Sequence, residues 1–340
     1  MKNINPFPAW RYNTQKITDL SQVLAPPYDV IGPNKRQKLI QASDYNVVQI
    51  DLPEAPEGQD KYAKAAQIFE SWKQSEVLKQ DQSPALYLYF QTYTLEDGRT
   101  FTRKGFFARK KLEAFGEGSV KPHERTFEGP KADRLKLMQA TSANLSAIFG
   151  LYTDPEGTSS AILTELAQGE PDIKVQWEDQ VHQLWRVQEE GLIAKLLDPI
   201  QNSSVLIADG HHRYETALNY RGLRRQQLGE GATGEESFEG VLMYLCPLSD
   251  PGLIVLPTHR VLAARPSVSE EDLRQRLLGF GTLQDYSLDQ VEDLMKDLEA
   301  LGETRALAWI DGNRASLFVL DGEKITKSKT LSKLSQRLQK

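Results

Sequence analysis

The fold prediction depends on one stretch of sequence, Ser204-Val205-Leu206-Ile207-Ala208-Asp209-Gly210-His211-His212-Arg213. A short apolar run with β-branched residues gives way at Asp-Gly to a helical pattern that continues to Leu228. This order predicts a strand, a tight turn and the start of a helix. The first turn of a helix leaves backbone N–H groups unpaired and carries partial positive charge. An anion is therefore favoured at this turn.

The residue types at this turn suit a phosphate. Gly210 permits close approach, Arg213 can bind with two parallel hydrogen bonds, and His211 or His212 can donate a further one. A structural alternative stays open, in which Asp209 only caps the helix and the two histidines pack against the body of the protein.

A metal site is the competing chemical interpretation. His211 and Glu215 are one helical turn apart and could share a face. A magnesium ion bound to a nucleotide would instead need carboxylates, which Asp209, Glu124 and Asp133 could supply. The sequence leaves the metal ligands undecided.

A second group of polar residues precedes another predicted helix, at residues 131–143. His123 and Glu124 suit acid/base chemistry, and Lys131 and Arg134 suit phosphate neutralisation. The alternative is a solvated charged loop, which needs no function.

Weaker signals indicate substrate contacts. Tyr28 and Asp29 could form a wall and a polar contact, Asn144 could bind a ligand or end a helix, and His259 and Arg260 could meet an anion. The glycines do not have GxGxxG or Walker-type spacing, so the common dinucleotide and P-loop sites are not supported.

Composition limits the class of protein. The 340 residues predict two or three compact units, and a net charge of −6 lacks the basic footprint of an independent duplex-DNA binder. The apolar runs are far shorter than the roughly 20 residues that span a bilayer. We therefore expect a cytoplasmic protein without a membrane partner, whose oligomeric state stays open. The single cysteine, Cys246, lies in an apolar run and is expected to be buried.

The order of elements predicts an α+β fold with mixed sheets and packed helices, because strands and helices alternate without regular βα units. Three regions are expected: an N-terminal arm, helix and β-hairpin at 1–115, a phosphate-binding α+β core at 116–262 and a C-terminal α+β region at 263–340. The predicted strands include the hairpin of Ala85–Thr94 with Phe101–Leu112, and a strand at Leu253–Leu256.

Four blocks of the sequence resemble family 1015 of the domains of unknown function. They are APPYDVI at 25–31, HERTFEGPKADRL at 123–135, TSANLSAIFGLY at 141–152 and ADGHHRYETAL at 208–218. The DGHHR block also resembles the phosphate-contacting motif of the ParB and sulfiredoxin superfamily, which includes a free serine kinase. That second resemblance is local.

The local resemblance implies a ParB/sulfiredoxin-like region with a phosphate cradle at Gly210, His211, His212 and Arg213. Asp209 would position the acceptor hydroxyl or contact a metal. The candidate catalytic residues are therefore Asp209 and His212, to which the chemistry of their side chains adds His123 and Glu124.

We expect a nucleotide-dependent phosphotransferase that uses ATP or ADP with Mg²⁺ to modify a small hydroxylated metabolite, with free serine as one candidate. Two alternatives remain. A ParB-like nucleotide switch would use the cradle while partner contacts change, and a non-catalytic metabolite sensor would bind the same anion without turnover.

Overall fold

A computed structural model gives the arrangement of the chain. It describes residues 2–124, 126, 128–256, 261, 269–302, 304–310 and 314–327, without the side chains of residues 128, 130, 270 and 325–327. The chain divides into two compact units, Met1–Val255 and Leu256–Lys340. The fold is mixed α/β, with ten α-helices among the described residues.

A nine-stranded mixed sheet forms the centre of the first unit. Its strands follow the spatial order β6 (Val120–Lys121), β10 (Val205–Asp209), β7 (Ile148–Tyr152), β11 (Gly240–Pro247), β5 (Thr100–Lys111), β4 (Leu86–Thr94), β9 (Gln180–Val187) and β8 (Ile173–Trp177), with β1 (Ile4–Asn5) on β5. The β6–β10 and β7–β11 pairs are parallel, and the others are antiparallel. A separate pair joins β2 (Trp10–Tyr12) to β3 (Leu78–Gln80).

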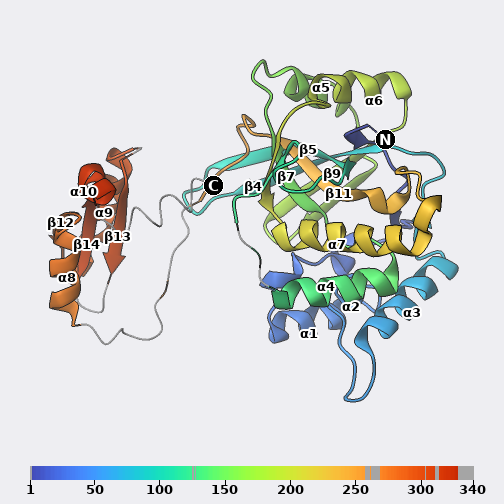
Figure 1. The fold of residues 1–340 in the computed structure, drawn as a ribbon, viewed down its shortest axis with the longest axis horizontal. Coiled ribbons are helices and arrows are strands. Elements are labelled where there is room, and N and C mark those ends of the chain that lie inside the picture. Colours follow the sequence, from blue (N-terminus) through green and yellow to red (C-terminus); the bar gives the residue numbers. More distant parts are fainter. Residues whose placement is uncertain are drawn as a thin grey trace. The chain divides into compact units, whose positions relative to one another are not determined.

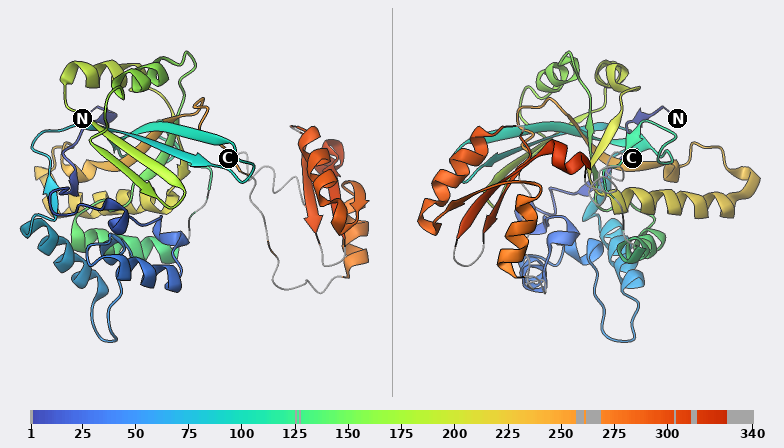
Figure 2. Two further views of the ribbon diagram at one scale, coloured as in Figure 1. Left: turned by 180° about the vertical axis from the view of Figure 1, so that it is seen from behind. Right: turned by 60° about the vertical axis from the view of Figure 1, so that its left-hand side comes forward.

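The described residues of the first unit also form seven α-helices. They are α1 (Pro33–Ala42), α2 (Val48–Asp51), α3 (Lys61–Gln74), α4 (Glu128–Thr141), α5 (Thr158–Leu166), α6 (Glu190–Leu197) and α7 (His211–Leu228). In the view of Figure 1, α5 and α6 lie above the strands and α7 lies below them, and the view from behind in Figure 2 shows the same order. Helix α4 packs on α7, and α3 packs on α4.

Alternation of side chains along the strands explains the main core. In β4, Leu86, Leu88 and Phe90 point to one face and are buried, together with Phe106 and Ala108 of β5. Successive side chains of a strand point to opposite faces, so this spacing covers one face with apolar groups. Helices α5, α6 and α7 contribute further buried residues to the same core.

The second unit has its own small core. Its three-stranded antiparallel sheet has the order β12 (Gly281–Tyr286), β14 (Ala315–Leu320) and β13 (Ala306–Ile310). Its helices are α8 (Glu270–Leu278), α9 (Val291–Ala300) and α10 (Gly322–Lys327). Leu294 of α9 is buried against Tyr286, Ala315 and Leu317, so this unit has an apolar core separate from that of the first.

The helix predicted after Asp-Gly and continuing to Leu228 is confirmed as α7, and the hairpin predicted from Ala85–Thr94 and Phe101–Leu112 is confirmed as β4–β5. Strands from residues 1–115 and from residues 116–262 lie in one sheet, and the division into three regions stays a prediction. Cys246 is buried as expected, and burial raises the pKa of its thiol to about 12.

The predicted strand at Leu253–Leu256 is wrong. Strand β11 ends at Pro247, and a turn follows in which the Leu253 N–H donates to the Asp250 carbonyl at 2.9 Å. Leu253 then packs against Leu151, Tyr244 and Cys246, so its apolar character serves packing without strand pairing. In the part of the chain that the structure describes, no helix is both long and apolar enough to cross a bilayer.

We expect Gly105→Ala to destabilise the first unit by about 1–3 kcal/mol, because overpacking a filled core costs this much. A Cβ at position 105 of β5 would overlap the Leu245 carbonyl oxygen and lie 2.7 Å from the ring of Tyr244. Urea unfolding of the full chain measures the change in the free energy of unfolding.

Gly222→Ala in α7 is the matched control. No atom lies within 4 Å of the position that its Cβ would take. Alanine in a helix interior is more favourable than glycine, so this variant should gain up to about 1 kcal/mol. Equal stability of the two variants would contradict the close approach at Gly105.

Candidate functional site

The turn between β10 and α7 requires glycine. Gly210 has φ 95° and ψ 29°, in the left-handed region, and its carbonyl accepts the hydrogen bond of the Tyr214 N–H at 2.9 Å. Side chains other than glycine are strained in this conformation. A Cβ at this position would also lie 3.0 Å from Nε of Arg213. The turn brings Asp209 and Arg213 together at the start of α7.

Arg213 joins three parts of the chain. One terminal nitrogen of its guanidinium, Nη1, donates to the Ala147 carbonyl just before β7, and the other, Nη2, pairs with Oδ2 of Asp209. The side chain of Arg213 is 12% exposed, and that of Asp209 is 54% exposed. Arg213 is therefore held from inside the protein, while its carboxylate partner remains accessible to solvent.

A small cavity lies beside Arg213. It has a volume of about 40 Å³, and the four predicted residues in its lining are Tyr28, Arg134, Asn144 and Arg213. These residues come from a short 3-10 helix (Tyr28–Val30), from α4, from the segment after α4 and from α7. The volume has room for a few water molecules or a small anion, and a whole nucleotide would have to extend beyond it.

Arg134 forms one wall of the cavity and is fixed by carboxylates. Its Nη1 donates to the Asp51 carbonyl at 2.6 Å, and its Nη2 pairs with Oδ2 of Asp133 at 2.8 Å. The side chain is only 7% exposed, and its guanidinium lies 4.2 Å from the centroid of the Tyr28 ring. This cation–π contact orients Tyr28.

Asp133 is itself held by several donors. Burial alone would raise its pKa, but hydrogen bonds from Lys61, Arg134 and Tyr62 lower the pKa to about 2. Its carboxylate is ionised and used for structure. Asp133, which the sequence offered as a metal ligand, therefore supports Arg134.

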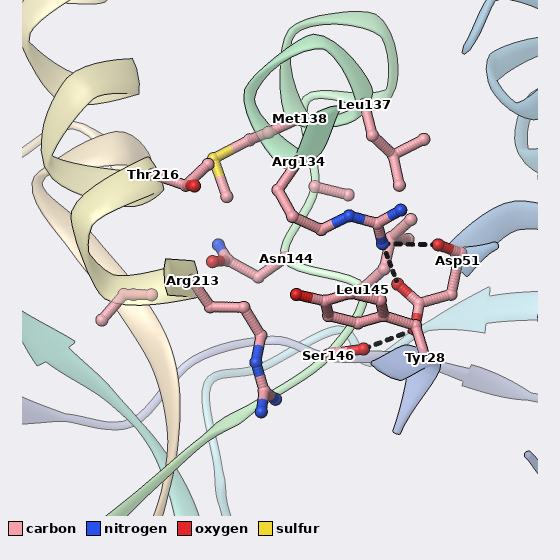
Figure 3. A pocket seen from close by; sticks show the side chains of 12 residues that line it. Tyr28, Asp51, Arg134, Leu137, Met138, Asn144, Leu145, Ser146, Arg213 and Thr216 are labelled. Carbon is pink, nitrogen blue, oxygen red and sulfur yellow. Dashed lines mark hydrogen bonds and ion pairs between the residues drawn. The ribbon is translucent and has the colours of Figure 1, made fainter. Parts of the chain in front are cut away.

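Three polar groups of the cavity lining lack partners within the described residues. The Tyr28 hydroxyl and the Asn144 side chain form no hydrogen bond there, and Figure 3 shows that hydroxyl pointing toward the space between Asn144 and Arg213. Oγ1 of Thr216 is buried without a partner, and Thr216 is 1% exposed. Tyr28 is half-buried and Asn144 is exposed, whereas a buried polar group such as Oγ1 of Thr216 normally has a partner. A polar ligand or water in the cavity would supply one.

Burial raises the pKa of Tyr28, and the positive charges of Arg134 and Arg213 partly offset this. The hydroxyl is therefore kept protonated and is available as a hydrogen-bond donor to an anion. The cavity is therefore lined by three groups that carry hydrogen-bond donors, the Tyr28 hydroxyl and the guanidinium groups of Arg134 and Arg213.

A second polar group surrounds His211 and Glu215 of α7. The His123 N–H donates to Nε2 of His211 at 3.2 Å, and the two rings meet edge to face with centroids 4.5 Å apart. Nδ1 of His211 lies 3.8 Å from Oε2 of Glu124. Because Nε2 accepts a hydrogen bond, Nδ1 carries the proton of the neutral ring. His211 thus holds the segment around His123 against α7.

Glu215 serves the same segment. Its Oε2 accepts hydrogen bonds from Thr126 at 2.7 Å and from Lys131 at 2.9 Å. Burial would raise the pKa of Glu215, but these two donors lower it. Among the described residues, no group of three or more His, Cys, Asp or Glu side chains could hold a metal ion.

The remaining predicted residues lie outside the cavity lining. Asp29 is exposed, and His212 lies half-buried in the first turn of α7. His259 and Arg260 lie outside the described residues. Sequence reasoning missed Asp51, Ser146 and Thr216 in the lining, although Ser146 and Thr216 fall within two of the quoted blocks. Ser146 donates to Oδ2 of Asp51 at 2.6 Å, which joins the segment after α4 to the end of α2.

Residues 4–335 match the family described as "Protein of unknown function (DUF1015)". Neither the curated proteins nor the solved structures include a match to this chain.

We expect His211→Gln to reduce the pH dependence of stability. Burial lowers the pKa of His211, as do His123 and His212, while Glu124 and Asp209 oppose the shift. Because the folded pKa is below the ordinary value of about 6.5, the unfolded chain binds the proton first as the pH falls, and stability is lost on acidification.

Urea unfolding at several values between about pH 5 and pH 7 tests this prediction. The free energy of unfolding of the variant should change less across this range than that of the wild type. A glutamine oxygen can still accept from the His123 N–H, which limits the structural damage. An unchanged slope would show that His211 does not titrate in the folded protein as proposed.

Proposed function

The chain belongs to the DUF1015 family, and we propose that it is a nucleotide-dependent phosphotransferase that phosphorylates a small hydroxylated metabolite. Free serine is the first acceptor to test, because the DGHHR block resembles that of a free serine kinase. The proposal includes a ParB/sulfiredoxin-like region around β10 and α7. The observation that carries it is the cavity where Tyr28, Asn144 and Thr216 offer unpaired polar groups beside Arg213.

The cavity is suited to the transferred phosphoryl group. Phosphoryl transfer requires mainly positioning and neutralisation of negative charge. Tyr28 and Asn144 can donate hydrogen bonds, and Arg213, in the first turn of α7, supplies a fixed positive charge. Arg213 is already fixed by Asp209 and the Ala147 carbonyl, and Tyr28 is oriented by Arg134, so these two groups require little reorganisation on binding.

Asp209 is the proposed base. The acceptor hydroxyl oxygen forms a bond to the terminal phosphorus of the donor, and the bond from that phosphorus to its bridging oxygen breaks. The hydroxyl proton passes to the Asp209 carboxylate, and the shortened nucleotide leaves. Asp209 is more than half exposed at the end of β10, so an acceptor from solvent can reach it.

The Asp209–Arg213 pair links binding to this step. A phosphate that enters the cavity competes with Asp209 for Nη2 of Arg213. Exchange of the carboxylate for the phosphate leaves Asp209 free to accept a proton when the donor is bound. Arg213 keeps its position throughout, because its other terminal nitrogen remains on the Ala147 carbonyl.

ATP or ADP with Mg²⁺ is the proposed donor. The ion neutralises phosphate charge in such reactions. Because the described residues form no three-ligand cluster, the ion would arrive with the nucleotide. Asp209 and Glu124 are the exposed carboxylates nearby, at 54% and 66%. His123 and His212 are proposed to assist in proton transfer or phosphate binding.

Tyr28→Phe and Asn144→Ala test the cavity. We expect each variant to lower kcat/KM for phosphoserine formation by about tenfold or more, because a hydrogen bond to a charged group is worth about 1.5–3 kcal/mol. The assay incubates the full chain with L-serine, Mg²⁺ and ATP or ADP, and measures phosphoserine by phosphorus NMR.

Tyr220→Phe is the matched control, since it removes a hydroxyl from the middle of α7 that does not line the cavity. It should keep the wild-type rate. Wild-type activity that survives unchanged in both cavity variants would remove the cavity from the mechanism. Nucleotide binding without a phosphorylated product from serine or other small alcohols would instead favour the switch or the sensor.

A further inference from the structure

One face of the nine-stranded sheet carries a row of aromatic side chains beside the turn at Gly210. Phe149 of β7, Tyr244 of β11, Phe107 of β5 and Tyr89 of β4 form the row, which we call the aromatic row. The centroids of neighbouring rings are 5.3 Å, 5.3 Å and 5.2 Å apart along it. Tyr244 is buried, and the other three are half-buried.

The row begins next to the candidate base. Phe149 is the β7 partner of Asp209 in the strand register, and Tyr244 is the β11 partner of Phe149. Neighbouring strands lie about 4.8 Å apart, so Tyr244 lies about 10 Å from Asp209 and Phe107 about 14 Å. The row therefore leads away from the proposed phosphate position across the sheet.

Two buried nitrogen atoms along the row have no hydrogen-bond partner in the described part of the chain. Nε of Arg103 is one of them, and its guanidinium lies 4.7 Å from the centroid of Phe149. Nε2 of His182 is the other. Nδ1 of His182 lies 2.6 Å from the Tyr89 hydroxyl, so when that hydroxyl donates, Nε2 carries an unpaired N–H.

We propose that the aromatic row binds the purine base of the nucleotide donor while its terminal phosphate lies at Gly210 and Arg213. This inference rests on the proposed function, and it assigns a position to the part of the donor for which the 40 Å³ cavity has no room. A purine has flat faces that stack on aromatic rings and ring nitrogens that accept hydrogen bonds. Arg103 and His182 supply donors along the same row.

Charge also favours this occupant. Arg103 adds a positive charge over the rings of Phe149 and Tyr244, at 4.7 Å and 5.7 Å from their centroids. A ligand that is aromatic at one end and anionic at the other matches a surface with an aromatic row beside Arg103 and with Arg213 at the row's end. A purely apolar ligand would offer no acceptor to Nε of Arg103 or to Nε2 of His182.

Phe149→Leu and Phe107→Leu test the inference by calorimetric titration of the full chain with ATP and, separately, with tripolyphosphate, each with Mg²⁺. We expect both variants to bind ATP about tenfold more weakly, because stacking on an aromatic ring is lost, and to bind tripolyphosphate as the wild type does. Phe149→Tyr keeps the stacking face and should bind ATP normally.

Phe101→Leu is the matched control, because Phe101 lies on the same strand six residues away and pairs with Tyr93 at 6.0 Å. It should bind both ligands like the wild type, and thermal melting checks that each variant folds. Unchanged ATP affinity in both row variants would overturn the inference. So would equal wild-type affinity for ATP and tripolyphosphate.

The two proposals can fail separately. Phosphoserine formation with normal ATP binding in the row variants would support the phosphotransferase proposal and contradict the purine-binding site. Loss of ATP affinity in the row variants, without phosphoserine formation by the wild type, would support the purine-binding site and contradict the phosphotransferase proposal. A wild type that binds neither ligand would contradict both.

Discussion

The contact on which the candidate site most depends is the pair of hydrogen bonds from Arg213 to Asp209 and to the Ala147 carbonyl. These hydrogen bonds hold together the end of β10, the first turn of α7 and the segment just before β7. Because Gly210 has a positive φ, the chain can turn tightly enough for residues 209 and 213 to meet. The segment that carries Asn144 is fixed by the same contact, since it leads directly into Ala147. The cavity exists because these segments cannot move apart independently.

Arg134 connects these segments to the N-terminal part of the chain. Helix α4 packs on α7, which places Arg134 on the far side of the cavity from Arg213. Its guanidinium is buried between carboxylates of Asp51 and Asp133 and stacks on Tyr28. A buried charge whose partners are removed is strongly destabilising, so this arrangement holds α2, α4 and the Tyr28 segment in a single geometry.

Local signals in the sequence were sufficient for part of this structure. The β-branched run, Asp-Gly and the helical pattern after it predicted β10 and α7, because each signal acts within a few residues. The sequence did not indicate α1 or α5, and the apolar run at Leu253–Leu256 was misleading because a run without a pairing partner can pack as an irregular segment. The cavity depends on helices that pack across long sequence separations, and the spacing of residues along the sequence does not show this packing. The cavity brings together Tyr28, Arg134, Asn144 and Arg213. The sequence alone also does not show which groups pair with a charged side chain. Asp133 was predicted as a possible metal ligand, but in the structure it accepts hydrogen bonds from Lys61, Tyr62 and Arg134.

The charges around the cavity balance within the described residues, and this balance constrains how an anion could bind. Arg134, Arg213 and Lys61 pair with Asp51, Asp133 and Asp209. An incoming phosphate therefore meets few bare charges and must either use neutral donors such as the Tyr28 hydroxyl or displace a carboxylate. Asp209 is the most exposed of the three carboxylates. Its ion pair is therefore the weakest of the three, and displacing it costs the least free energy. The solvent exposure that lets a phosphate replace Asp209 on Arg213 also lets an acceptor hydroxyl reach Asp209. Phosphate binding and proton transfer can therefore be coupled through this one side chain.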